Sequence, residues 1–313
     1  MRQTRSLGTA SWRLLAAALL LLSPALWSAP ARAHHEYRVL LLNSYSHTLS
    51  WTADITRGVE QGLATLDHPV RLHVEFMDTK NIYTEEYLDL LASQYRLKYR
   101  DIRFDVIIAS DDNAARFALK YRATLFGGAP MVFCGVNDAD FLQEGSRGGV
   151  TGVYEAVDIE GTIATILSLQ PGVGTIHLIS DETTTGRINR AAAGAVLPRF
   201  AGHTRFAWIG ETSLPELEAV VAALPPEDAC LFISYNRDRL GRWYAYDEAI
   251  ERISRASTVP VYGFWDFLLS RGNVLGIVGG VLASGRHQGW LAADMAGRIM
   301  AGERAESIMP VSQ

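Results

Sequence analysis

The stretch FDVIIASDDNAARFALKYRATL, residues 104–125, decides the fold class. Its first part, 104–110, is a nearly continuous apolar run, which is typical of a strand buried on both faces of a parallel sheet. The run ends at Ser110 and Asp111, and apolar residues then recur at helical spacing over 112–125. A buried strand that leads directly into an amphipathic helix is the repeating unit of an α/β fold.

The same alternation continues along the chain from residue 37. Further strands are predicted over 37–43, 71–76, 130–136, 148–153, 175–180, 203–209, 229–234 and 260–264. Further helices are predicted over 51–66, 84–100, 158–169, 185–200, 213–223, 242–256 and 288–301. The strands form two series, so we predict two Rossmann-like α/β lobes, each with a parallel sheet flanked by helices.

The first 33 residues are set apart from this pattern. Arginines precede an apolar run over 14–22, and Ala31-Arg32-Ala33 follows it. This is the pattern of a secretory signal with a small-residue cleavage site. The remaining chain is then divided into an N-terminal lobe over 34–153, a C-terminal lobe over 154–264, and a crossover over 265–313 whose helix returns to the N-terminal lobe.

The net charge of the chain after residue 33 argues against a nucleic-acid partner. The signal carries four of the 29 basic residues and none of the 34 acidic ones, which leaves a formal charge of −9 on the rest. Because phosphate binding requires a basic face, we expect no nucleic-acid partner. No later stretch approaches the length of a membrane span, so a soluble periplasmic protein is expected.

Small polar residues, acids, amides and aromatics follow nearly every predicted strand. In open α/β sheets, ligands bind at the carboxyl ends of the strands. Ser, Asp, Asn and Thr are also the preferred helix N-caps, so each of these groups of residues after a strand, here called a strand tip, has a purely structural explanation as well. The strand tips taken together favour a ligand-binding pocket, because several of them also contain Tyr or Trp, which a helix cap does not need. Tyr45, Trp51, Tyr235 and Trp265 are the expected walls, whereas Trp243 and Tyr246 are expected to pack on their helix.

Motifs for catalysis are weak in this chain. The sequence contains no G-x-S-x-G elbow, no phosphate-binding P-loop and no H-E-x-x-H helix. We therefore expect no catalytic residue, no metal and no cofactor, and a secreted hydrolase is only a distant alternative.

Several blocks, in order, resemble one family. VLLLNSY (39–45), VIIASDDNAARFA (106–118), APMVFCGVND (129–138), GVTGVYE (149–155), LISDETTTGR (178–187) and VYGFWDFLLSRGNVLGIVGG (261–280) look like the ABC transporter substrate-binding proteins of the periplasmic binding protein superfamily. The resemblance implies a two-lobed protein that closes on a small ligand and delivers it to a membrane permease. Similar domains serve as sensors of histidine kinases or diguanylate cyclases, so a membrane-bound signalling partner stays an alternative. The chain departs from many transport members because it lacks a lipobox cysteine.

The resemblance also implies a set of cleft residues. By position these are Ser44, Tyr45, Ser110, Asp111, Asn137, Asp138, Asp181, Thr183, Thr185, Tyr235, Asn236, Trp265 and Asp266. We hypothesise that two carboxylates, Asp111 and Asp181, accept hydrogen bonds from a ligand group such as an ammonium. The hydroxyls of Ser110 and Thr183 would orient the ligand, and the rings of Tyr45 and Trp265 would cover it.

Overall fold

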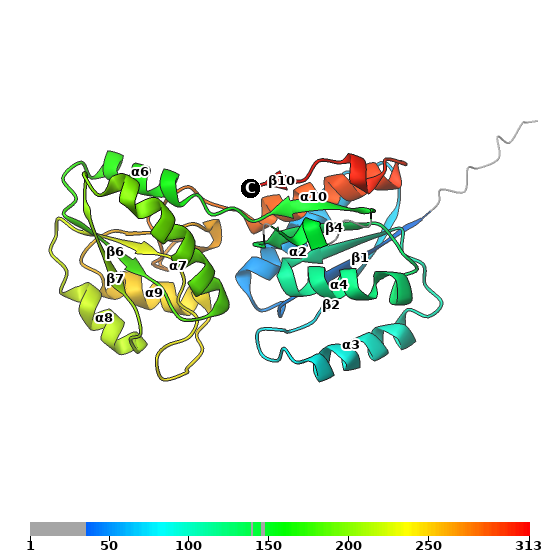
Figure 1. Cartoon of the computed structure of the whole chain (residues 1–313), viewed down its shortest axis with the longest axis horizontal. Coiled ribbons are helices and arrows are strands. Elements are labelled where there is room, and N and C mark those ends of the chain that lie inside the picture. Colours follow the sequence, from blue (N-terminus) through cyan, green and yellow to red (C-terminus); the bar gives the residue numbers. More distant parts are fainter. Residues whose placement is uncertain (1–35, 139, 145–147) are drawn as a thin grey trace, which may run out of the picture. The chain divides into compact units, whose positions relative to one another are not determined.

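The structure is a computed structural model of the chain and describes residues 36–138, 140–144 and 148–313. The signal predicted for 1–33 lies outside these residues. Within the described part of the chain, no helix is long and apolar enough to cross a membrane. Strands and helices alternate along it and build two separate sheets, which confirms the predicted α/β class with two parallel sheets (Figure 1).

The first sheet has the order β10-β5-β4-β3-β1-β2, and every neighbouring pair is parallel. Its strands are β1 (Tyr37–Asn43), β2 (Val70–Phe76), β3 (Val106–Ser110), β4 (Met131–Val136), β5 (Val150–Tyr154) and β10 (Val311–Ser312). All residues of β3 and β4 are buried, as expected for strands covered on both faces. The two-residue β10 is too short to leave a periodic signal in the sequence.

The strand order of this sheet reverses between β1 and β3. From β1 the chain moves outward to β2, and it then returns to the other side of β1 to form β3. The backbone N–H of Ser44, just after β1, donates to the carbonyl of Ser110 at 3.1 Å. Ligands of open α/β sheets bind at such a switch point, outside the carboxyl ends of the strands.

Helices cover both faces of the first sheet. They are α2 (Ser50–Leu63), α3 (Glu85–Lys98), α4 (Asp111–Leu125), the short α5 (Phe141–Glu144) and α10 (Gly285–Met300), with the turn η3 (Ala305–Ser307). Alternate residues of β1 serve two cores: Val39 and Leu41 pack with α2 and α10, whereas Leu40 and Leu42 pack with α3 and α4. A Cβ atom on Gly58 of α2 would lie 2.0 Å from the carbonyl oxygen of Arg286, so glycine permits the close approach of α10.

The second sheet has the order β7-β6-β8-β9 and is also parallel throughout. Its strands are β6 (Thr175–Ile179), β7 (Arg205–Ile209), β8 (Ala229–Phe232) and β9 (Val261–Tyr262). The helices beside it are α6 (Ile159–Leu169), α7 (Thr184–Val196), α8 (Leu214–Ala222) and α9 (Tyr246–Ala256), with the turns η1 (Leu197–Phe200) and η2 (Asp266–Leu268).

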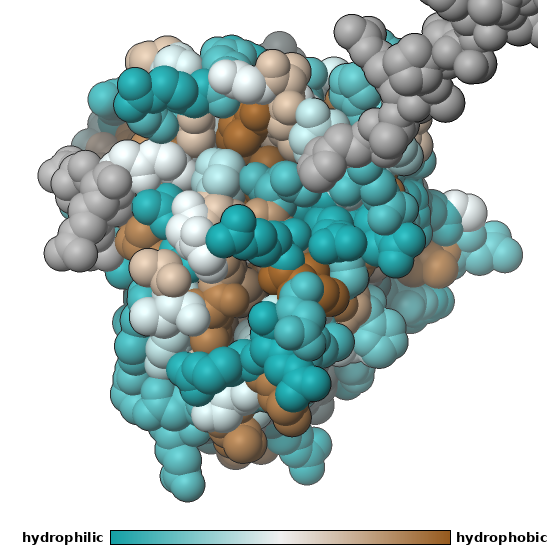
Figure 2. All heavy atoms as spheres, turned by 90° about the vertical axis from the view of Figure 1, so that its right-hand side faces the viewer, coloured by the Kyte–Doolittle hydropathy of each residue, from teal (hydrophilic) through white to brown (hydrophobic). Residues whose placement is uncertain are grey.

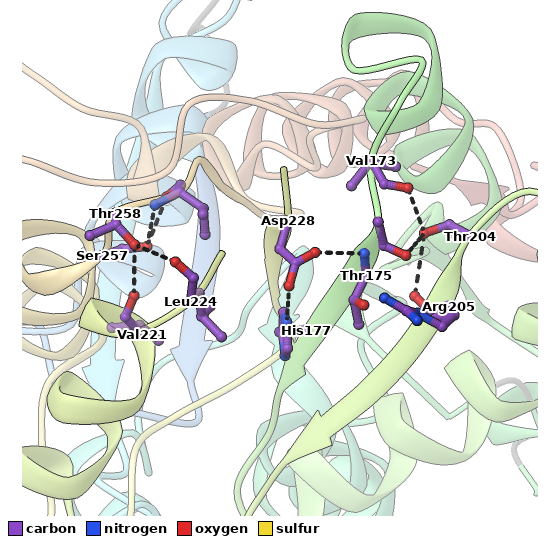
Figure 3. A network of polar contacts seen from close by, with 12 residues as sticks. Val173, Thr175, His177, Thr204, Arg205, Val221, Leu224, Asp228, Ser257 and Thr258 are labelled. Carbon is purple, nitrogen blue, oxygen red and sulfur yellow. Dashed lines mark hydrogen bonds and ion pairs between the residues drawn. The ribbon is translucent and has the colours of Figure 1, made fainter. Parts of the chain in front are cut away.

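A polar network fixes the amino ends of the second sheet (Figure 3). The buried Asp228 carboxylate accepts the backbone N–H of Thr175 at 2.8 Å and contacts Nε2 of His177 at 2.9 Å. These contacts tie the loop before β8 to the start of β6. They lie at the opposite end of the strands from the polar tips, so this network supports the sheet without lining the candidate site.

The chain passes from the first sheet to the second after β5, and α10 returns to the first sheet. Residues 265–283 remain beside the second sheet, because Trp265 forms a bridge with Ala283 and Tyr262 forms one with Gly279. β10 then pairs with β5 at the edge of the first sheet. The division into domains at 153/154 and 264/265 stays a prediction.

One face of the molecule is drawn in Figure 2. Hydrophilic side chains cover most of its coloured part, and the hydrophobic ones form small groups between them. Scattered apolar residues are normal on a protein surface, so this face gives no reason to infer a partner.

Candidate ligand-binding site

Two neighbouring cavities open at the carboxyl ends of the strands. The inner cavity has a volume of about 610 Å³ and is lined by Tyr45, Thr48, Leu49, Ser50, Trp51, Lys80, Asp111, Asn137, Glu155, Ala245, Tyr246, Asp247, Trp265 and Phe267. The outer cavity has a volume of about 1550 Å³ and is lined by Tyr45, Thr79, Lys80, Tyr83, Asp112, Asn113, Arg116, Asn137, Asp138, Thr183, Ile188, Asn189 and Trp243. The two cavities share Tyr45, Lys80 and Asn137.

Asp111 begins α4 directly after β3 and points its carboxyl group at the inner cavity. Its φ of +68° is unusual for a residue with a side chain. The Trp51 indole N–H donates to Oδ1 at 2.9 Å, and the Ser110 hydroxyl donates to Oδ2 at 2.8 Å. Each carboxyl oxygen thus has one donor and keeps capacity for another.

The ionisation of Asp111 is strongly perturbed. Burial and then the nearby Glu155 carboxylate raise the pKa of Asp111 to about 8, although the hydrogen bonds from Ser110 and Trp51 act in the opposite direction. Perturbed acids in a cavity are typical of functional sites. This position therefore has the electrostatics of a site that gains from a positively charged ligand.

Glu155, the first residue after β5, is held in the same way as Asp111. The Trp265 indole N–H donates to Oε1 at 2.6 Å, and the Asn137 amide donates to Oε2 at 3.2 Å. Burial raises the pKa of Glu155 to about 7, while the hydrogen bonds from Trp265 and Asn137 lower it. The inner cavity thus contains two carboxyl groups that are each oriented by an indole N–H.

Lys80 supplies a positive charge between the two cavities. The preceding Thr79 is fixed by its backbone N–H and its hydroxyl, which both donate to the Ser44 carbonyl at 2.8 and 2.7 Å. The Lys80 ammonium lies 4.8 Å from the ring centre of Tyr45 and 5.7 Å from that of Tyr246. Burial lowers the pKa of Lys80, against the carboxylates of Asp111, Asp181 and Glu155. Among the described residues, no hydrogen bond or ion pair engages this ammonium.

Aromatic rings form much of the remaining wall. The ring centre of Tyr246 lies 6.1 Å from that of Trp265 and 6.0 Å from that of Phe267. The ring centre of Phe267 in turn lies 6.1 Å from that of Trp51. Trp51 comes from α2 beside the first sheet, and Tyr246 comes from α9 beside the second. A mainly aromatic wall with a few oriented polar groups is the usual composition of a small-molecule site.

The structure brings part of the predicted site together. Tyr45, Asp111, Asn137 and Trp265 line the inner cavity, and Asp138 and Thr183 line the outer one. Trp51 lies in the inner wall as expected. The contribution of these residues to ligand binding stays a prediction.

The expectation for Asp181 is corrected. Its carboxylate accepts five hydrogen bonds, from the backbone N–H and the hydroxyl of Thr183, the hydroxyl of Ser234, and the backbone N–H groups of Asn236 and Arg237. It is 3% exposed and lines neither cavity. A carboxylate has about four acceptor positions, so Asp181 has none to offer a ligand. It clamps the loop after β6 to the loop after β8.

Three further predicted residues are buried and line neither cavity. Ser44 is fully buried; its hydroxyl donates to the Ser110 carbonyl and accepts the backbone N–H of Ala114, each at 2.7 Å. Ser110 acts through Asp111, as described above. The hydroxyl of Tyr235 donates to the Thr212 carbonyl at 2.7 Å, and this ring lies in the core, away from both cavities.

Two further predicted residues, Asn236 and Asp266, do not line the cavities in the described structure. The Asn236 side chain donates to the Tyr244 carbonyl at 3.2 Å. Asp266 begins η2 and accepts, through its backbone carbonyl, a hydrogen bond from Arg271 at 3.1 Å. Neither residue lines a cavity. The side chain of Thr185 lies outside the described residues.

The residues predicted from the sequence leave out several that line the inner cavity, and among these are Lys80, Glu155, Tyr246 and Phe267. Two of these residues also follow strands, so the rule that ligands bind at the carboxyl ends of strands applies to them as well. Lys80 follows β2 and Glu155 follows β5, so a search of every strand tip would have included both. The sequence predicts that Tyr246 packs on its helix, whereas in the structure Tyr246 is the first residue of α9 and lines the inner cavity.

Comparisons with known proteins show the fold. No family model matches the sequence, and no curated protein matches it. An ABC domain in complex with L-tryptophan from Streptococcus pneumoniae is similar in structure, with a TM-score of 0.61, 14% identity and 89% of each chain covered. A substrate-binding protein with adhesive properties from Clostridium difficile has a TM-score of 0.60 and 15% identity, over 88% of this chain and 89% of that one.

A solute-binding protein of an ABC transporter from Rhodopseudomonas palustris, in complex with 3,4-dihydroxybenzoic acid, is also similar. Its TM-score is 0.56 at 13% identity, with 87% of this chain and 83% of that chain covered. Identities as low as these show the fold alone. The chain has the fold of the ABC transporter substrate-binding proteins, which is the periplasmic-binding-protein fold.

Proposed function

We propose that this protein is an extracytoplasmic solute-binding protein that closes on a small, amino-acid-like aromatic ligand and delivers it to an ABC-type transporter. The observation that carries the proposal is the inner cavity, where two carboxyl groups held by indole N–H groups and one ammonium group lie among aromatic rings. This arrangement complements a ligand that has an ammonium, a carboxylate and a ring.

The charges suggest how such a ligand lies. Asp111 and Glu155 each keep acceptor capacity, so they take the ligand ammonium between them. The Lys80 ammonium has no hydrogen-bond or ion-pair partner among the described residues and takes the ligand carboxylate. The ligand ring lies against Tyr246 and Phe267, where aromatic pairs add to the burial of apolar surface.

The ligands of two similar structures support this choice of chemistry. The Streptococcus pneumoniae domain holds L-tryptophan, and the Rhodopseudomonas palustris protein holds 3,4-dihydroxybenzoic acid. Both molecules combine an aromatic ring with a carboxyl group. The inner cavity has aromatic rings and an ammonium group that complement a ligand with a ring and a carboxyl group. Its two acids, Asp111 and Glu155, also complement a ligand ammonium.

Closure around the ligand is the expected mechanism. Ser50 at the start of α2 donates to the carboxylate of Asp247 in the first turn of α9, and Trp265 donates to Glu155. These bonds join elements beside the two sheets, and all four residues line the inner cavity. A ligand that contacts both sides binds the closed form better, and it shifts the population by that difference in affinity.

The same binding event serves the alternative function predicted from the sequence, a ligand-sensing domain of a histidine kinase or diguanylate cyclase. The two functions differ in the partner that the closed form contacts. A gene for an ABC permease beside the gene for this protein would favour transport, and a gene for a membrane-bound kinase or cyclase would favour sensing.

Isothermal titration with L-tryptophan, L-tyrosine and L-phenylalanine tests the proposal. We expect one-to-one binding of at least one of them, and a loss of about 30-fold in affinity for Trp265→Leu, because that variant removes a ring and the donor to Glu155. Trp290→Leu is the matched control, since Trp290 is 40% exposed on α10 and lines neither cavity. No binding of any of the three, or equal losses in both variants, would contradict the proposal.

A further inference from the structure

The proposed ligand leaves the outer cavity unused. This cavity has more than twice the volume of the inner one, about 1550 Å³ against about 610 Å³. The two cavities are adjacent, because Tyr45, Lys80 and Asn137 line both. One ligand that is longer than an amino acid can therefore occupy both at once.

The acids of the outer cavity are already engaged. The Asp112 carboxylate accepts the backbone N–H groups of Asn137 and Asp138 at 3.3 and 3.2 Å. The Asp138 carboxylate forms an ion pair with Arg116 and accepts the backbone N–H of Asp140 at 3.0 Å. These acids hold the loop after β4 in place, so they do not favour a second cationic group.

Several donors that line the outer cavity lack an acceptor in the described structure, and two of them are nitrogen groups that are largely buried. One is the Lys80 ammonium at the boundary between the cavities. The other is the side-chain amide nitrogen of Asn189 on α7, a residue that is only 3% exposed and lines the outer cavity. A buried N–H without an acceptor is unfavourable, so a group that brings an oxygen to it gains affinity.

We propose that the outer cavity is a second subsite, which takes an oxygen-bearing extension of the ligand. The ligand class is then a short peptide with an N-terminal aromatic residue. This inference rests on the proposed function: the ammonium and the ring occupy the inner cavity as described above. The peptide carbonyl meets Lys80, and the acceptor groups beyond it meet Asn189.

Isothermal titration with L-tryptophan and the dipeptide L-tryptophylglycine tests this subsite. We expect the dipeptide to bind about 10-fold more tightly than L-tryptophan. Asn189→Leu keeps the branched shape and the number of side-chain heavy atoms and removes the donor, so it should lower dipeptide affinity about 10-fold and change L-tryptophan affinity less than about 2-fold. Asn273→Leu is the matched control, because Asn273 is exposed and lines neither cavity.

The outcomes separate the two proposals. If the dipeptide binds no more tightly than L-tryptophan, or if Asn189→Leu affects both probes equally or neither, the second subsite is overturned while the proposed function stands. If neither probe binds, both proposals fail. L-tryptophan binding by the Asn189→Leu variant also shows that this variant is folded.

Discussion

Two acids at matching places in the two sheets have different environments. Ser110 ends β3 and Asp111 begins α4, whereas Ser180-Asp181 follows β6 and precedes α7. Both carboxyl groups are almost fully buried, at 3% exposure each. Asp111 receives two hydrogen bonds and lines the inner cavity, while Asp181 receives five and lines neither cavity.

The difference lies in where the donors come from. The donors to Asp181 include two backbone N–H groups of the loop after β8, which wraps around it. The donors to Asp111 are two side chains, those of Trp51 and Ser110, and no backbone loop encloses its carboxyl group among the described contacts, so it lines the inner cavity. The same Ser-Asp pair after a strand can therefore fix a loop or present an acid to a ligand. The neighbouring loops decide which of these it does.

The largest effect is expected from Asp181→Ala. This change leaves three backbone N–H groups and two hydroxyls without their acceptor in a buried place, so the free energy of unfolding should fall by about 3–5 kcal/mol. Urea unfolding of the purified protein measures it. If Asp181→Ala costs less than Asp111→Ala, the structural role assigned to Asp181 is wrong.

Asp111→Asn should act on binding instead of stability. The asparagine keeps the size and one acceptor for Trp51, but it loses the charge that meets the ligand ammonium. We expect L-tryptophan affinity to fall by about 30-fold, or about 2 kcal/mol, with the free energy of unfolding changed by less than about 1 kcal/mol. Calorimetric titration beside urea unfolding gives both values. A loss of stability without a loss of affinity would make Asp111 resemble Asp181.

The pH dependence of binding tests the assignment of Asp111 to the ligand ammonium in a second way. The pKa of Asp111 is raised to about 8 and that of Glu155 to about 7, and a ligand ammonium favours their ionised forms. Affinity for L-tryptophan should therefore rise by about 10-fold between about pH 6 and about pH 8, and Asp111→Asn should flatten this rise. Titrations at several pH values measure it, and affinity that falls with pH in this range would contradict the assignment.

Stability should change in the opposite direction over that range. Because both acids have folded pKa values above their ordinary 3.8 and 4.5, the folded protein binds more protons than the unfolded chain. Their contribution is fully present below pH 3.8 and is lost as the pH rises toward about 8. The free energy of unfolding of the ligand-free protein, measured at several pH values, should show a smaller decline in Asp111→Asn.

The smallest effect concerns the backbone behind Asp111. Gly135 in β4 has a φ of +67°, and a Cβ there would lie 3.1 Å from Oδ1 of Asp111. Gly128 has a φ of +77° with nothing within 4 Å of its Cβ position, so Gly128→Ala is a matched control for backbone strain. Both variants should lose about 1 kcal/mol of stability, and only Gly135→Ala should also weaken L-tryptophan binding, by about 3-fold. Equal affinities in the two variants would show that Asp111 tolerates the displacement.

The fold was predictable because burial on both faces of a sheet leaves a local pattern. The predicted strand over 37–43 coincides with β1, and the predicted helix over 112–125 differs from α4 by one residue at its start. The packing of α10 on α2 depends on the contact of Gly58 with the Arg286 backbone, which no local pattern reveals. The two residues of β10 pair with β5 from the far end of the chain, and this pairing is equally invisible in the sequence.

The candidate site was predictable only in part. The rule that ligands bind at the carboxyl ends of strands selects Tyr45, Asp111 and Trp265, because each closely follows a strand. It also selects Asp181, and only the three-dimensional course of the loop after β8 shows that Asp181 has no free acceptor. Tyr246 lies well after β8, so its place in the wall depends on an irregular loop that periodicity does not describe.

The central claim is that the inner cavity holds an aromatic amino acid through Asp111, Glu155 and Lys80. A crystal structure of the protein grown with L-tryptophan tests it most directly. The account predicts the indole ring beside Tyr246 and Phe267, the ammonium within hydrogen-bonding distance of the Asp111 and Glu155 carboxylates, and the ligand carboxylate at Lys80. A ligand bound elsewhere, or an inner cavity that stays free of L-tryptophan at saturating concentration, would contradict it.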